Sequence, residues 1–246
     1  TTGIKSEFLR FNRRLNNNKY RMFNNIMQIM SFSDNMEYAD YDNQKMQGSY
    51  YSTTSLGKAF FNSMHEERND ELVYNLRDIS DDDINSVLSD ANKLIIKNTP
   101  EFKTNCEVNT NTNLFLSSIY SRKRFYFFLR FGIAYVRTID KDNNAIWQKQ
   151  IMRYPQYFAT RKISEKIDSG IKKGIVWHTQ GSGKTALAFF NIRYLKYKFG
   201  KKGVISNFYF VVDRLDLASQ AKNEFEKRGL RVKLISKKSD MNVPFD

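Results

Sequence analysis

The C-terminal part of the chain is predicted to be an α/β fold on two observations. From residue 174 onward, short apolar segments alternate with segments of helical periodicity, in the order strand, helix, strand, helix, strand. A glycine-rich turn joins the first of these strands to the first helix. Alternation of this kind predicts right-handed crossovers and a parallel sheet. The part of the chain that precedes it is predicted to be a mixed α+β region.

In the first half, a strand and a helix are predicted. The segment NNIMQIMSFSDNMEYADY (24–41) alternates enough to predict one or two strands. Within ISDDDINSVLSDANKLIIKN (79–98), Ser80 followed by Asp83 resembles a capping box, which marks a helix start. The apolar stripe of that helix consists of Ile84, Val87, Leu88, Ala91 and Ile95.

The middle of the chain is predicted to be a loop followed by a helix. TPEFKTNCEVNTNTN (99–113) has no periodicity and is rich in Asn and Thr, so a loop or inter-domain connection is expected. A long aromatic helix is expected from about residue 114, ending in a turn at KDNN (141–144). Its closely spaced charges, at Arg122, Lys123, Arg124 and Arg130, argue against a bilayer span and favour a buried amphipathic helix.

The C-terminal elements are more sharply defined. Strands are predicted at GIVWH (174–178), FYFVVD (208–213) and RVKLIS (231–236). A helix is predicted over 184–199, ended by Gly200, with an inward stripe of Ala188, Ile192, Leu195 and Phe199. The second helix, DLASQAKNEFEKR (216–228), ends at Gly229 and directs Leu217, Ala221 and Phe225 inward.

Composition restricts the classes of function. The single cysteine, Cys106, excludes an internal disulfide framework and a cysteine-based zinc cluster. The two histidines, His65 and His178, support neither a histidine-based metal site nor a Ser-His-Asp triad. The N-terminus has no secretory leader pattern, and a cytoplasmic protein without a membrane partner is expected.

The net charge of +14 is unevenly distributed. Residues 1–150 hold 20 Lys and Arg against 18 Asp and Glu, whereas residues 151–246 hold 20 against 8. Clustered Lys and Arg release counterions from a phosphate backbone, so the second part is the candidate for a polyanion partner. Solvated helix faces are the alternative explanation.

The segment TQGSGKT (179–185) is the strongest motif in the sequence. Between an apolar strand and an amphipathic helix, Gly181, Ser182 and Gly183 allow backbone N–H groups to surround phosphate. Lys184 is expected to reach the β- and γ-phosphates, and the Thr185 hydroxyl to bind Mg²⁺. A strict phosphate loop has its first glycine where His178 stands. The alternative is a glycine turn with a helix-capping threonine.

Two further segments are candidate parts of the same site. In MRYPQYFATRKI (152–163), Gln156 offers the donor and acceptor that an adenine edge requires, and Arg153 is placed to stack on the base, which favours ATP over GTP. Alone, both residues are typical of any surface helix. In VVDRLDLASQ (211–220), Arg214 stands where the acid of an ATP hydrolase would follow Asp213, so contact with a nucleic-acid backbone is the preferred interpretation.

Together, MRYPQYFATRKI, GIVWHTQGSGKTALAFFN and FYFVVDRLDLASQ resemble the motor part of the R (restriction) subunits of type I restriction–modification enzymes. WHTQGSGKT with VDRLDL is the most specific pair, and the histidine before the loop is usual in this family. FNNIMQIMSFSDNMEY and SRKRFYFFLRFGIAYV match more loosely, the first to a strand near the end of the nuclease domain and the second to the helix joining nuclease to motor.

The resemblance implies an enzyme that uses ATP and Mg²⁺ to translocate and cleave double-stranded DNA, with methyltransferase (M) and specificity (S) subunits as partners. It implies the end of a nuclease domain over 1–113, a linker helix region over 114–148 and an incomplete RecA-like first motor domain over 149–246. Arg153 and Gln156 would recognise adenine; Gly181, Gly183, Lys184 and Thr185 would hold ATP and Mg²⁺. A DNA-side motif would contain Asp213, Arg214 and Asp216.

The chain also departs from the family pattern. The nuclease carboxylates are expected before residue 1, because Lys5 and Glu7 are in the wrong order and context. The acid pair of the motor and the second motor domain are expected after residue 246. An internal segment that binds nucleotide but neither translocates nor cleaves is therefore expected. The alternatives are another superfamily 2 helicase or translocase, and a DNA-binding module with a non-hydrolysing phosphate loop.

Overall fold

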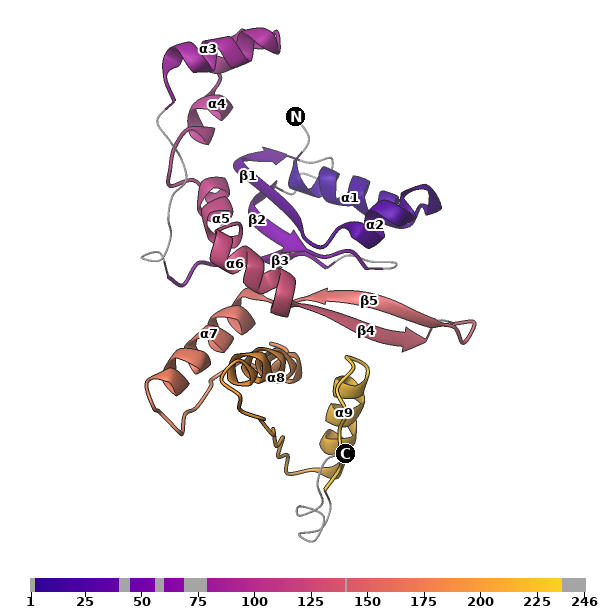
Figure 1. Cartoon of the computed structure of the whole chain (residues 1–246). Helices are drawn as coiled ribbons and strands as arrows, with labels where there is room; N and C mark the ends of the chain where they lie inside the picture. Colours follow the sequence, from indigo (N-terminus) through magenta and orange to yellow (C-terminus); the bar gives the residue numbers. More distant parts are fainter. Residues whose placement is uncertain (1–2, 40–44, 56–59, 69–78, 140, 236–246) are drawn as a thin grey trace. The chain divides into compact units, whose positions relative to one another are not determined.

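The computed structural model describes residues 3–39, 45–55, 60–68, 79–139 and 141–235. The chain divides into two compact units, Thr1–Arg130 and Phe131–Asp246. Each contains helices and a small antiparallel sheet (Figure 1), so the predicted mixture of α and β structure is confirmed.

The first unit is built on a three-stranded antiparallel sheet in the order β1 (Met30–Ala39), β2 (Lys45–Ser52), β3 (Asn62–Ser63). Met30 pairs with Ser52 and Ala39 with Lys45, with an irregularity in the register between Asp34 and Tyr38. The strand predicted within residues 24–41 is therefore confirmed.

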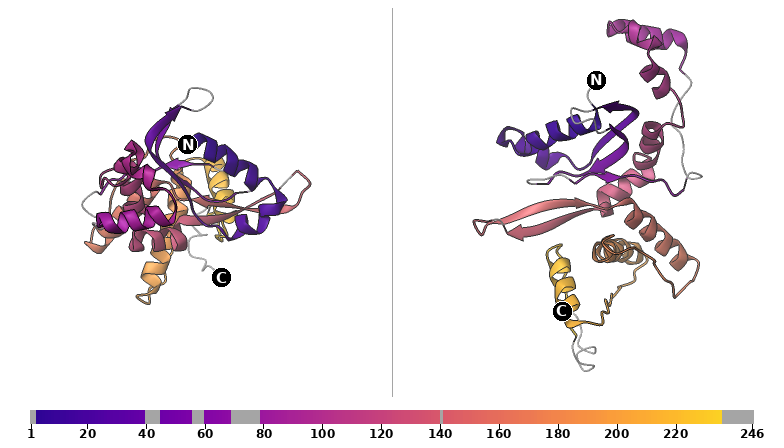
Figure 2. Two further views of the ribbon diagram at one scale, coloured as in Figure 1. Left: turned by 90° about the horizontal axis from the view of Figure 1, so that it is seen from above. Right: turned by 180° about the vertical axis from the view of Figure 1, so that it is seen from behind.

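Helices pack on both sides of these strands. Helix α1 (Ile4–Leu15) is followed by a 3₁₀ turn (Asn18–Tyr20) and α2 (Arg21–Ile26). In both directions of view, α1 lies along one side of β1 and β2 and helix α5 (Asn111–Ile119) along the other (Figure 2). Beneath α1 is a core of apolar side chains: Phe11, Leu15, Met27, Met30, Phe32 and Phe61.

The helix start predicted at Ser80 is confirmed, with Ser80 as the N-cap. The Asp83 amide donates to Ser80 Oγ at 3.1 Å, and Ser80 Oγ donates to the Asp83 carboxylate at 2.6 Å. Helix α3 (Asp81–Asp90) begins there. Leu88 is buried on the predicted stripe, whereas Val87 is exposed and Ile95 lies beyond the helix end.

The loop expected over 99–113 is wrong, because two helices occupy parts of it. Helix α4 (Pro100–Asn105) is capped by Thr99, whose Oγ1 accepts from the Phe102 amide at 3.3 Å. Helix α5 is capped by Thr110, which accepts from the Asn113 amide at 3.4 Å. The threonines at both positions are N-caps, and Pro100 occupies the first helical position, which tolerates proline.

The expectation of one long helix from residue 114 is also wrong, because the helical part is interrupted and residues 133–139 form a strand. Helix α5 is followed by α6 (Arg122–Phe127) and a π-helical turn (Phe128–Gly132). Strand β4 (Ile133–Ile139) then pairs in antiparallel register with β5 (Ala145–Ile151). Ala134 and Val136 are buried while Tyr135 and Arg137 are exposed, which is the two-residue period of a strand. The turn predicted at 141–144 is confirmed as the hairpin connection.

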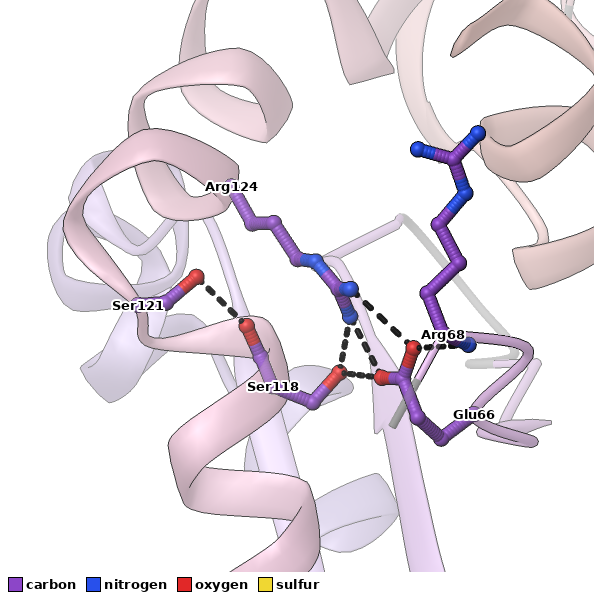
Figure 3. A network of polar contacts seen from close by, with 5 residues as sticks. All are labelled: Glu66, Arg68, Ser118, Ser121 and Arg124. Atoms are coloured by element: carbon purple, nitrogen blue, oxygen red, sulfur yellow. Dashed lines mark hydrogen bonds and ion pairs between the residues drawn. The ribbon is translucent and has the colours of Figure 1, made fainter. Parts of the chain in front are cut away.

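A buried ion pair joins distant parts of the first unit (Figure 3). Arg124 of α6 donates to the Glu66 carboxylate from Nη1 at 2.5 Å and from Nη2 at 3.0 Å. Ser118 Oγ donates to the same carboxylate at 2.6 Å, and the Arg68 amide at 2.9 Å. Burial raises the pKa of Glu66, but the hydrogen bonds and charge of this network outweigh it, so the pKa lies below its usual 4.5.

In its described residues, the second unit contains the β4–β5 hairpin and the helices α7 (Tyr154–Asp168), α8 (Lys184–Gly200) and α9 (Leu215–Glu226). The helices predicted over 184–199 and 216–228 are confirmed. Helix α8 packs on α7 and on α9. Lys198 of α8 donates to Ser164 Oγ at 2.5 Å and pairs with Asp168, both on α7. The Arg137 amide donates to the Lys227 carbonyl at 2.8 Å, which ties the hairpin to the end of α9.

Among the described residues of this unit, no pairing of the expected parallel strands is found. Residues 174–178, 208–213 and 231–235 have no strand assignment, and residue 236 lies outside the described residues. Ile175 and Trp177 are 92% and 90% exposed, and Val211 is 90% exposed. A parallel ladder requires each segment to lie beside a partner strand and between helix layers. These segments lack that pairing, so their side chains remain exposed.

Within the described parts of the chain, we find no helix with both the length and the apolar character that crossing a bilayer requires.

Candidate nucleotide-binding site

The motif TQGSGKT (179–185) forms a turn stabilised by its own hydrogen bonds. The Thr179 carbonyl accepts from the Ser182 amide at 3.3 Å and from Ser182 Oγ at 2.7 Å. Gly181 and Gly183 have φ angles of 75° and 83°, in the left-handed region that favours glycine. The two glycines are therefore required by the backbone of the loop.

Helix α8 begins directly after this turn, at Lys184. Its N-cap is Gly183, so no side chain caps the first turn, and the first helical bond runs from the Leu187 amide to the Gly183 carbonyl at 2.9 Å. The uncapped N–H groups and the helix dipole favour an anion at this end. Lys184 is exposed and Thr185 is half-buried beside it. The residues present fit a phosphate group with its Mg²⁺.

The approach to the loop differs from the expectation. His178 is half-buried and Trp177 is exposed, and residues 171–179 have no regular secondary structure. The phosphate loop is thus formed without the strand that was predicted to lead into it.

The two predicted adenine-recognition residues lie at the start of α7, against the phosphate loop. Arg153 Nη1 donates to the Gly181 carbonyl at 3.5 Å. Gln156 is 3% exposed; its Nε2 donates to the Gly183 carbonyl at 3.0 Å and to the Ser182 carbonyl at 3.4 Å. The structure therefore brings together the segments around residues 153–156 and 181–183, which are far apart in the sequence.

The predicted DNA-side residues surround the start of α9. Arg214 is its N-cap residue, and its guanidinium donates to both carboxylate oxygens of Asp216, at 3.1 and 2.7 Å. Asp213 is exposed, as are both partners of this pair. Among the described residues, we find no hydrogen bond or ion pair between this group and the phosphate loop.

Sequence reasoning missed the contact between Gln156 and the loop backbone, and the part of Thr179 in closing the turn. No local pattern signals the Gln156 contact, because it joins residues 27 positions apart. The glycine at 183 reflects this contact, because a Cβ added there would lie 2.6 Å from Gln156 Nε2. The sequence alone does not show this, since the distance depends on the fold.

Comparison with known proteins supports this assignment of the motifs. Residues 149–242 match the family model described as the res subunit of type III restriction enzymes. A protein from Methanocaldococcus jannaschii, named as the endonuclease subunit of a type I restriction enzyme, is 39% identical over 103 residues, or 40% of this chain. A similarly named subunit from Staphylococcus aureus strain COL is 40% identical over 76 residues, or 31% of this chain.

These matches confirm the resemblance to type I restriction subunits, over part of the chain. The matched stretches span only 9% of the M. jannaschii protein and 8% of the S. aureus protein. A C-terminal part of another such subunit, from Mycoplasma pneumoniae, is 33% identical over 97 residues, which is 44% of its own length. No solved structure matches the chain.

Proposed function

We propose that residues 149–246 are the ATP-binding part of the motor of a restriction-enzyme subunit. The observation that carries this proposal is the phosphate loop: two left-handed glycines lead into an uncapped helix N-terminus with Lys184 and Thr185 in its first turn. The family match over 149–242 covers the same stretch and supports it.

In this proposal the N–H groups of Gly183 to Thr185 bind the phosphate oxygens. The Lys184 ammonium neutralises the charge on the β- and γ-phosphates, and the Thr185 hydroxyl is a ligand of Mg²⁺. Bound Mg²⁺ supplies charge neutralisation at the phosphates. Recognition of adenine by Arg153 and Gln156 stays a prediction.

We further propose that segments 174–178, 208–213 and 231–236 pair as the parallel sheet of a RecA-like domain in the whole protein. Their exposed apolar side chains support this, because a soluble domain buries such a patch against another layer. Residues 1–113 and 114–148 would then be the end of a nuclease domain and its connection to the motor.

The names of the matched relatives support the activity of the whole protein. In the whole protein, ATP would drive translocation along double-stranded DNA and the cleavage of that DNA, in a complex with M and S subunits. Asp213, Arg214 and Asp216 are proposed as the DNA-side motif. The exposed Arg214–Asp216 pair supports that role, since an exposed ion pair is easily exchanged for a phosphate contact.

Titration of the 246-residue chain with a fluorescent ATP analogue tests the nucleotide site. We expect saturable binding that depends on Mg²⁺ and weakens at least tenfold in Lys184→Ala, the cost of one lost charge-assisted contact of about 1.5–3 kcal/mol. The matched control is Lys196→Ala, an exposed lysine on the same helix. Equal affinities of Lys184→Ala and the parent chain would remove the ATP-site proposal.

A further inference from the structure

The start of helix α7 holds the outer face of the phosphate loop. Three carbonyl oxygens in succession, those of Gly181, Ser182 and Gly183, accept hydrogen bonds from side chains of the α7 N-cap and first turn. Arg153 supplies the first contact and Gln156 the other two. The contact at Gly183 is the shortest, at 3.0 Å.

The orientation of the Gln156 amide is fixed by its partners. Gln156 Oε1 accepts from the Arg153 backbone amide at 2.9 Å, and a backbone N–H requires an acceptor there. The loop carbonyls on the other side require a donor, which only Nε2 supplies. The side chain is 3% exposed, and both the oxygen and the nitrogen of its amide are hydrogen-bonded within the protein.

These contacts orient the peptide groups that face the ligand. In a trans peptide, the C=O and the following N–H point in opposite directions. Because Gln156 binds the carbonyls of Ser182 and Gly183, the N–H groups of Gly183 and Lys184 point away from α7. Successive N–H groups aimed in one direction are the arrangement that binds an anion.

The close approach of Gln156 explains why residue 183 has no side chain. A Cβ at that position would stand 2.6 Å from Gln156 Nε2, closer than real contacts allow. At Gly181, by contrast, an added Cβ would meet nothing within 4 Å. The backbone conformation favours glycine at both positions, but only at Gly183 would an added Cβ also displace the Gln156 amide from the loop.

We propose that Gln156 is a positioning residue that holds the phosphate loop in its binding conformation, so that its loss weakens binding of the triphosphate whatever base is attached. This inference rests on the proposed nucleotide site and deepens it. It differs from adenine recognition, in which the same amide would have to leave the loop and face the base.

The two roles make opposite predictions for ligands without adenine. A positioning residue affects ATP, GTP and inorganic tripolyphosphate by the same factor. An adenine-recognition residue affects ATP alone and leaves GTP and tripolyphosphate unchanged. The ratio of ATP to GTP affinity is therefore the quantity that separates them.

The test compares Gln156→Glu with the parent chain by calorimetric titration of all three ligands. A glutamate keeps the acceptor for the Arg153 amide, and so the helix cap, but cannot donate to the Gly183 carbonyl. Lys162→Gln, at an exposed position of α7, is the control with the same change in net charge. Thermal unfolding of each variant separates a loss of binding from a loss of folded protein.

We expect Gln156→Glu to weaken all three ligands about tenfold per folded molecule, with an unchanged ATP-to-GTP ratio. Its unfolding midpoint should lie below that of Lys162→Gln, because the new carboxylate is buried without a cation. Gln156→Ala should give the same pattern per folded molecule. Weakening confined to ATP, or no weakening in either variant, would overturn the positioning role while leaving the nucleotide site intact. Absence of binding by the parent chain would instead remove the site itself.

Discussion

At the scale of single residues, the first unit depends on the pair formed by Glu66 and Arg124. The side chains are 10% and 6% exposed, and the serine Ser118 completes the hydrogen bonding between them. A buried pair of this kind adds little net stability compared with apolar residues, but removing one partner leaves an uncompensated charge. The penalty for breaking it is therefore large.

Arg124→Met tests this directly. We expect the free energy of unfolding of the first unit to fall by about 3 kcal/mol, because Glu66 would stay buried without its cation. The measurement is urea unfolding followed by far-ultraviolet circular dichroism. Arg122→Met removes an exposed arginine from the same helix and should change the midpoint very little. Similar effects of the two substitutions would contradict the account.

The pH dependence of stability follows from the same carboxylate. The pKa of Glu66 is lower in the folded protein than its usual 4.5, so its contribution is complete above that pH. It is lost as the pH falls through the folded-state pKa, below 4.5. The stability difference between the parent chain and Glu66→Gln should thus shrink from pH 6 to pH 3.5. A difference that stays constant over this range would show that Glu66 gains nothing from ionisation.

Gly183→Ala is predicted to disable the phosphate loop. Alanine at φ 83° is strained, and its Cβ would displace Gln156. We expect binding of the fluorescent ATP analogue to weaken by more than tenfold. Gly200→Ala, at the other end of α8, meets no atom within 4 Å and serves as the control, with unchanged affinity. Parent-like binding by Gly183→Ala would mean that the loop tolerates a different conformation.

At the scale of elements, short-range patterns predicted helices better than they predicted strand pairing. Helix α9 was predictable because Ala221 and Phe225, one helical turn apart, are both buried, and helix α8 because it follows the glycine turn and ends at Gly200. The N-cap at Ser80 was predictable because its partner is three residues away. In each case the determining interactions are local.

The errors have identifiable physical causes. Thr99 and Thr110 cap helices that composition alone suggested to be a loop. Residues 133–139 continue an apolar run whose composition also suits a helix, but pairing with residues 145–151 makes them a strand. The described residues of the three predicted parallel strands have the expected composition but are not paired. Strand pairing depends on contacts between segments that are distant in the sequence, and the composition of one segment does not determine them.

In the candidate site, too, local features were predictable from the sequence and tertiary contacts were not. The composition of TQGSGKT was sufficient to predict the glycine turn and the helix start at Lys184. Gln156 is predicted from the sequence to recognise adenine, and the structure adds the contact of its amide with the loop backbone. Only the docking of α7 against the loop, a tertiary contact, places it there.

At the scale of the whole molecule, the uneven charge predicts where a nucleic acid binds. The excess of Lys and Arg in residues 151–246 lies in the second unit, and several of these residues are exposed on loops and helix faces. Phosphate contacts release counterions, so affinity for duplex DNA should fall steeply between 50 and 200 mM salt. Fluorescence anisotropy with the 246-residue chain measures it.

Two double substitutions locate this surface. Lys172→Glu with Lys173→Glu reverses two exposed charges of the second unit, and Lys93→Glu with Lys123→Glu reverses two exposed charges of the first. Both double variants change the net charge by the same amount. We expect only the first pair to weaken DNA binding substantially. Equal loss in both would indicate an effect of net charge alone, and no binding at low salt would remove the DNA contact.

The central claim, that residues 179–185 bind the phosphates of ATP, is tested most directly by hydrogen–deuterium exchange with and without Mg²⁺ and ATP. We predict slower exchange of the amides of Gly183, Lys184 and Thr185 in the parent chain, because their N–H groups would be bonded to phosphate. The same peptides of Lys184→Ala should show much less protection at equal ATP. Unchanged exchange in this segment at saturating ATP would contradict the account.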